Sequence, residues 1–258
     1  MKNFLKSYWK ALLFFTLAGV IGGFCCGLYL LDSYPPEIVQ EITDQGLTPF
    51  LAGVVSAYQA AGYGLVLGAL GIVLAKKICL WKDETKFEKK PLLAAFFIAI
   101  IGGVSIILPD LLYFGNYIPA VRDSYLTKPT GVFILGAVVY GGVIEEVMLR
   151  LFLMSLVAFL LHKIFGKGRE KPAVWMLVTA NIVAALLFVA ALLFAAGHLP
   201  TTYMLMGITP MILIRCFLLN GTFGLLFGWL YRKYGLRYAM ISHAGCHVIS
   251  KLIWILFI

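Results

Sequence analysis

Residues 91–114 read PLLAAFFIAIIGGVSIILPDLLYF, a stretch in which Asp110 is the only charged side chain. A hydrocarbon core of about 30 Å needs roughly 20 apolar residues in a helix, so this stretch is long enough to cross a membrane. Six further apolar runs of similar length lie at about residues 10–31, 49–75, 130–162, 172–198, 208–231 and 238–257. The pattern predicts a polytopic bundle of about seven transmembrane helices.

The composition points to the same fold class. Of the 258 residues, 62% are hydrophobic and 13% are charged, whereas an ordinary soluble domain has about 25% charged residues. These values exclude a soluble globular domain, a disordered chain and, in spite of a net charge of +9, a nucleic-acid-binding protein. No repeat or long linker divides the chain. We therefore predict one all-α membrane domain over residues 1–258, with the lipid bilayer as a partner.

Lysine and arginine residues gather in alternate loops. Sixteen of the 21 lie in residues 1–10, 76–90, 163–171 and 232–237, and only two lie in 32–48, 115–128 and 199–207. Cytoplasmic loops of membrane proteins carry an excess of these residues. The asymmetry predicts a multi-pass protein of the cell membrane, with its N-terminus in the cytoplasm and with 32–48 as a solvated outer loop.

Charged and imidazole side chains inside or at the ends of the apolar runs are exceptions to this pattern. They are Asp110, Glu145, Glu146, Arg150, His198, Arg215, His243, His247 and Lys251. A charge inside a membrane costs about 3 kcal/mol or more unless it is paired or hydrated, and it commonly marks a functional site. These residues are therefore the candidates for a site.

The densest group lies in GGVIEEVMLR, residues 141–150. On a helix Glu146 and Arg150 are four positions apart and share a face, which predicts an ion pair. Glu145 lies about 100° away around the helix and can face a different environment. Two carboxylates in different environments differ in proton affinity, so one stays ionised while the other acts as a base. The same residues could also hold helices together, or relay protons or cations in a transporter.

Three of the four histidines lie in or beside the late apolar runs. His198 follows Phe194-Ala195-Ala196-Gly197, and His243 and His247 are four positions apart, so their rings face the same way. Glu and His together can deprotonate a water and stabilise an oxyanion, or they can bind a metal. The histidines favour a catalytic site over a structural ion pair alone.

Straight helices would hold Glu145, His198 and His243 at different depths, at about 1.5 Å per residue. Broken, tilted or re-entrant helices around a water-filled cavity would bring them together. Gly141-Gly142 and Pro200 are the expected break points.

Three motifs stand in order on separate apolar runs: EExxxR at Glu145–Arg150, FxxxH at Phe194–His198 and HxxxH at His243–His247. Together they resemble the motifs of the CPBP family, which includes CAAX prenyl endopeptidases and bacteriocin-processing membrane proteases. The resemblance covers about residues 130–250. The family usually has Asn or Asp where this chain has His247.

The resemblance implies an intramembrane endopeptidase that hydrolyses a membrane-associated, prenylated or leader peptide. Its catalytic set would be Glu145, Glu146, Arg150, His198, His243 and His247. In that set Glu145 with His198 would activate the water, the two later histidines would stabilise the oxyanion, and the Glu146–Arg150 pair would hold the helix.

Alternatives remain at this point. A zinc ion bound by Glu145, His198 and His243 is chemically reasonable and would make the protein a metalloprotease. A non-catalytic immunity or scaffold protein of the same fold is a second function, and a small proton-coupled transporter is a third. Loss of activity on replacing Glu145, with the protein still folded, separates the enzyme from its non-catalytic relative.

Overall fold

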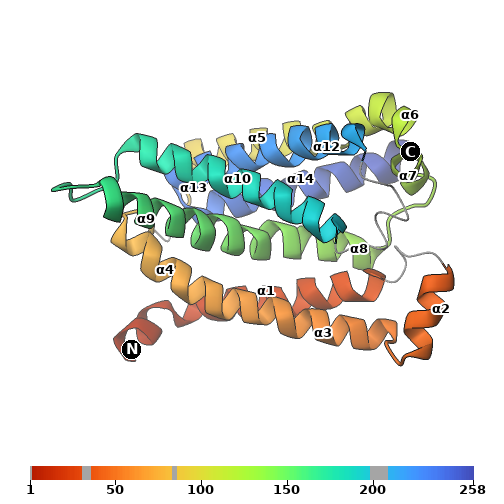
Figure 1. Cartoon of the computed structure of the whole chain (residues 1–258), viewed down its shortest axis with the longest axis horizontal. Helices are drawn as coiled ribbons and strands as arrows, with labels where there is room; N and C mark the ends of the chain where they lie inside the picture. Colours follow the sequence, from red (N-terminus) through yellow and green to blue (C-terminus); the bar gives the residue numbers. More distant parts are fainter. Residues whose placement is uncertain (1, 31–35, 83–85, 198–208) are drawn as a thin grey trace.

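The chain folds into a bundle of helices, and its described residues contain no strand. The structure is a computed structural model that describes residues 2–30, 36–82, 86–197 and 209–258. Most of the helices lie along one long direction (Figure 1). The all-α prediction is confirmed.

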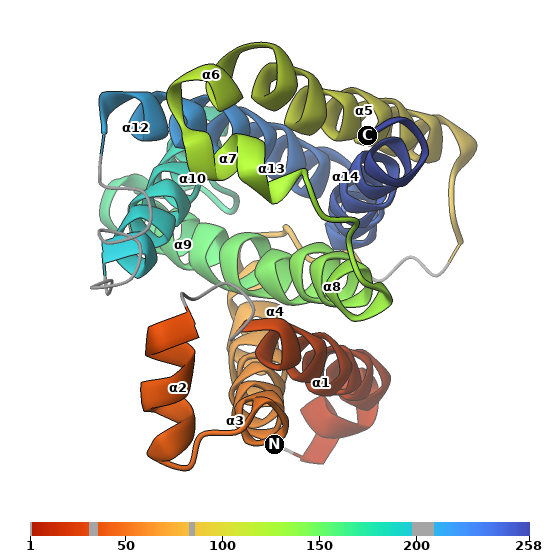
Figure 2. The ribbon, with the colours of Figure 1, turned by 90° about the vertical axis from the view of Figure 1, so that its right-hand side faces the viewer.

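The helices form three layers (Figure 2). In the first, α1 (Lys2–Leu30) packs along a helix that runs from α3 (Pro49–Gly62) through η2 (Tyr63–Leu67) into α4 (Gly68–Lys77). The middle layer is one long helix made of α8 (Gly131–Gly136), η4 (Ala137–Glu145), η5 (Val147–Met154) and α9 (Ser155–Phe165). The third contains α5 (Lys89–Pro109), α10 (Val174–Gly197), α13 (Thr222–Tyr234) and α14 (Leu236–Phe257). The middle helix therefore lies between the other two layers.

Short helices complete the described chain. They are α2 (Pro36–Asp44), η3 (Asp110–Phe114), α6 (Gly115–Tyr117), α7 (Pro119–Ser124), α12 (Pro210–Cys216) and η6 (Phe217–Gly221). The predicted outer loop at 32–48 thus contains a helix, although α2 buries none of its residues. Pro36 at its first position and Glu37 in its first turn favour a helix start there.

Among the described residues, five helical segments are long and apolar enough to cross a membrane: Lys6–Leu30, Pro49–Lys77, Lys89–Tyr117, Pro210–Tyr234 and Leu236–Phe257. They match five of the seven predicted runs, and the other two runs form the α8–α9 helix and α10. Large apolar side chains stay exposed on the bundle, for example Leu112 at 73% and Phe97 at 65%. Such a surface suits contact with lipid. A count of about seven spans stays a prediction.

Three of the four basic segments meet at one end of the bundle. Lys82 Nζ donates a hydrogen bond to the carbonyl of Lys233 at 2.5 Å, and Lys76 Nζ donates to the hydroxyl of Tyr8. These contacts join the N-terminal segment, residues 76–90 and residues 232–237. The arrangement agrees with alternate loops on one side of a membrane, and that this side is cytoplasmic stays a prediction.

A buried ion pair ties the opposite end together. Asp110 is 1% exposed and accepts hydrogen bonds from Arg215 Nε and Nη2, each at 2.6 Å. The Tyr125 hydroxyl donates to the same carboxylate at 2.9 Å. Burial and the neighbouring charge of Asp110 raise the pKa of Tyr125, so its hydroxyl stays protonated as a donor. Asp110 and Arg215, two of the candidate site residues, therefore form a structural ion pair away from the glutamates.

Candidate active site

The two adjacent glutamates lie where the middle helix is wound more widely than an α-helix. The π-helical segment η4 ends at Glu145, and a second one, η5, begins at Val147. The expected break at Gly141-Gly142 is absent, because the helix widens there and continues. A π-helix bonds residue i to residue i+5, is rare, and occurs frequently at functional sites. The same winding occurs at η2, η3 and η6, so the contacts of the two glutamates, and not the winding, identify the site.

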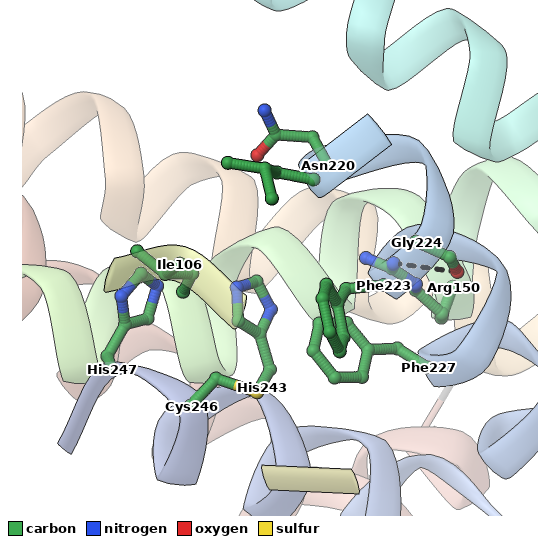
Figure 3. A pocket seen from close by; sticks show the side chains of 10 residues that line it. Ile106, Arg150, Asn220, Phe223, Gly224, Phe227, His243, Cys246 and His247 are labelled. Atoms are coloured by element: carbon green, nitrogen blue, oxygen red, sulfur yellow. Dashed lines mark hydrogen bonds between the residues drawn. The ribbon is translucent and has the colours of Figure 1, made fainter. Parts of the chain in front are cut away.

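Glu146 is fully buried and contacts two cationic or imidazole groups. Its Oε1 lies 2.8 Å from Arg150 Nη1 and 2.8 Å from His243 Nδ1. The predicted Glu146–Arg150 ion pair is thus confirmed. Arg150 also donates from Nη2 to the carbonyl of Gly224 on α13 at 3.1 Å (Figure 3). This network joins the middle helix to α13 and α14.

His243 stands between the two glutamates. Its Nδ1 faces Glu146, and its Nε2 lies 3.9 Å from Glu145 Oε2. The ring of Phe227 stacks on one side of the imidazole with a centroid distance of 4.6 Å, and His247 stacks on the other at 5.1 Å (Figure 3). A carboxylate on one imidazole nitrogen fixes the orientation of the ring and the position of its proton. The unpaired nitrogen of His243 is thereby directed toward Glu145.

Two glycines let the middle helix approach α14 closely. A Cβ atom at Gly141 would lie 2.6 Å from His247 Nε2. A Cβ atom at Gly142 would lie 2.6 Å from the Cβ atom of Ala244. Atoms do not normally approach so closely, so a side chain at Gly141 would displace the His247 ring and one at Gly142 would push α14 away.

Two cavities flank the histidines. The smaller, of about 70 Å³, lies between α5, α13 and α14 and is lined by His243, His247 and Arg150 (Figure 3). The larger, of about 320 Å³, lies between α1, the middle helix and α14, and is lined by Glu145, His247 and Lys251. His247 borders both cavities. Glu145 therefore faces a space large enough for water and part of a peptide.

Five of the six predicted site residues come together in this way: Glu145, Glu146, Arg150, His243 and His247. The sixth, His198, lies outside the described residues, as does Pro200. Among the residues that the structure describes, no group of three His, Cys, Asp or Glu side chains could hold a metal ion. The zinc set proposed from the sequence includes His198, so it stays a prediction.

Sequence reasoning missed Phe227, which stacks on His243 and also lies 5.4 Å from the Arg150 guanidinium. The chain has 19 phenylalanines, so no local signal separates this one from those that face lipid. The carbonyl of Gly224 was missed for a different reason: every residue has a backbone carbonyl, so the sequence does not indicate which one accepts a hydrogen bond from Arg150.

A comparison with known families matches the part of the chain that contains these residues. The family model described as type II CAAX prenyl endopeptidase Rce1-like matches residues 127–249, which include all six predicted site residues. No curated protein and no solved structure matches the chain. Over residues 127–249 the chain is thus similar to the Rce1-like CAAX prenyl endopeptidases of the CPBP family.

Proposed function

We propose that the chain is an intramembrane endopeptidase in which Glu145 is the base that activates water. One observation carries this assignment: the two adjacent carboxylates have different surroundings. Glu146 is bound by Arg150 and His243 at 2.8 Å, whereas Glu145 lines a cavity and lies 3.9 Å from the nearer nitrogen of His243. A carboxylate held by a cation is a poor base, and one that faces a cavity can accept a proton.

In the proposed reaction Glu145 takes a proton from water, and the hydroxide attacks the carbonyl carbon of the scissile peptide bond. Glu146 stabilises the imidazolium form of His243, as a buried carboxylate does in other hydrolases. The Nε2–H group of His243 then donates to the oxyanion, with His247 as a second donor. The proton on Glu145 passes to the leaving amine as the C–N bond breaks. By the family resemblance, His198 assists Glu145.

The family match and the apolar outer surface of the bundle support a membrane-bound substrate. We propose a peptide held at the membrane, of the CAAX type or a similar one. The direct test is hydrolysis of a farnesylated peptide that ends in a CAAX motif by the purified protein in liposomes, compared with the Glu145→Gln variant.

We expect His247→Asn to keep activity within about tenfold of the wild type, and His247→Ala to lose about 10²- to 10³-fold. Asparagine keeps an N–H donor for the oxyanion, whereas alanine removes it. The turnover rate and the metal content of the three proteins check this prediction. If His247 bound a metal instead, both variants would lose activity and metal alike. Equal turnover by all three would give the residue a purely structural role.

We expect Gly141→Ala to lower hydrolysis by about 10²-fold, because the new methyl group displaces the His247 ring and a shift of about 1 Å has this effect. Gly131→Ala is the matched control, since a Cβ atom at Gly131 has no neighbour within 4 Å. The rates of both variants in the liposome assay test this. Wild-type turnover by Gly141→Ala would show that the close approach is not needed.

A further inference from the structure

A third polar side chain continues the row of histidines on α14. Lys251 follows His247 by four positions, as His247 follows His243, so all three share one face of the helix. Lys251 is 9% exposed and lines the 320 Å³ cavity together with Glu145 and His247. The proposed reaction makes no use of this residue.

The ammonium group of Lys251 contacts two aromatic rings. Its Nζ lies 4.9 Å from the ring centroid of Phe133 and 5.6 Å from that of Trp254. Within the described ranges no carboxylate lies within ion-pair distance of this ammonium, and no oxygen accepts a hydrogen bond from it. The charge of Asp110, at the same end of the bundle, does act on Lys251, but the Asp110 carboxylate is already bound by Arg215 and Tyr125. An unpaired cation in such a place is costly, and a bound anion would neutralise it.

We propose that Lys251 binds the free C-terminal carboxylate of the substrate and so selects peptides that end a few residues beyond the scissile bond. This inference rests on the proposed function, because it takes the scissile bond to lie between Glu145 and the histidines. Lys251 is then a specificity-determining residue.

The spacing along α14 sets the length of the peptide tail. His247 and His243 precede Lys251 by four and eight positions, which correspond to about 6 and 12 Å along a helix. An extended peptide advances about 3.3 Å per residue. A carboxylate held by Lys251 therefore lies about two to four residues beyond the bond that is cut.

The rest of the cavity suits an apolar tail. Its wall also includes Tyr29, Phe133, Ala137 and Tyr140. These side chains offer rings and a methyl group for contact with the residues between the scissile bond and the carboxylate. A single cation at the end of an apolar pocket is a specific receptor for one terminal carboxylate.

Peptides that differ only in their terminus test the proposal. A farnesylated peptide with a free C-terminal acid is compared with its C-terminal amide in wild type, Lys251→Met and Lys128→Met. Methionine keeps most of the length and apolar character of lysine. Lys128 is a matched control because it is exposed at the same end of α14 and donates to the carbonyl of Ile255 at 3.0 Å.

We expect the wild type and Lys128→Met to prefer the acid over the amide by about 10- to 100-fold in kcat/KM, the range for a hydrogen bond to a charged group. Lys251→Met should treat the two peptides alike. Equal rates for the two peptides in the wild type, or a preference that survives in Lys251→Met, would overturn the proposal.

Two further measurements keep the test independent of catalysis and of the variant's folding. The Glu145→Gln variant should bind the peptide acid more tightly than the peptide amide. If this preference were found but the wild type did not hydrolyse the peptide, the proposed reaction would be wrong and the role of Lys251 would stand. A series of wild-type substrates with tails of one to six residues should show highest turnover at two to four. Equal turnover at all lengths would contradict the proposal.

Discussion

Replacing Glu145 with glutamine should lower peptide hydrolysis by about 10²- to 10⁴-fold, the usual contribution of a general base. Glutamine has nearly the same shape but cannot accept the proton of the attacking water. The helix bundle should stay intact, because Glu145 faces a cavity and its shortest contact to His243, at 3.9 Å, is too long for a hydrogen bond. The measurement is the turnover of a farnesylated CAAX peptide by equal amounts of inserted protein.

Glu37→Gln provides the matched control for this experiment. It makes the same chemical change on α2, where Glu37 is exposed and far along the chain from the site. Its turnover should equal that of the wild type. Hydrolysis by Glu145→Gln at the wild-type rate would mean that another group is the base, and no hydrolysis by the wild type would favour a non-catalytic protein or a transporter.

Replacing Arg150 with methionine should destabilise the folded protein by about 3–5 kcal/mol, the usual effect of removing one partner from a buried ion pair. Glu146 is fully buried and would keep only His243 as a partner, and the carbonyl of Gly224 would lose its donor. Thermal unfolding in detergent, followed by the loss of helical signal, measures the change.

The double variant Glu146→Gln/Arg150→Met distinguishes the ion pair from simple loss of packing. Neutral glutamine can still accept a hydrogen bond from His243 and leaves no unpaired charge, so the double variant should be more stable than Arg150→Met alone. If Arg150→Met unfolded at the wild-type temperature, or if the second substitution gave no recovery, the pair would have no stabilising role.

The local parts of this structure could be predicted from the sequence. The apolar run at 91–114 corresponds to the helical segment Lys89–Tyr117. The ion pair between Glu146 and Arg150 follows from their spacing, and so does the stacking of His243 on His247. These features depend on helical geometry and on the need to bury or pair charge in a membrane.

The remaining features depend on how distant segments pack. The contact between Glu146 and His243 joins residues 97 positions apart, and spacing within one helix carries no information about it. The resemblance to a known family implied an oxyanion role for His243, but no feature of the sequence indicates that Glu146 contacts its ring. The π-helical winding at η4 and η5 was also missed, because a run of apolar residues has the same appearance in either kind of helix.

The 97-residue separation between Glu146 and His243 has a consequence for synthesis of the protein. At about 5–20 residues per second, the acids leave the ribosome some 5–20 s before the histidines. Throughout that interval Arg150 is close enough in sequence to neutralise Glu146, and His243 does not yet exist. Arg150 therefore lowers the cost of placing Glu146 in the bilayer before α14 is synthesised. The site of Glu145, Glu146 and His243 can assemble only after α14 has been made.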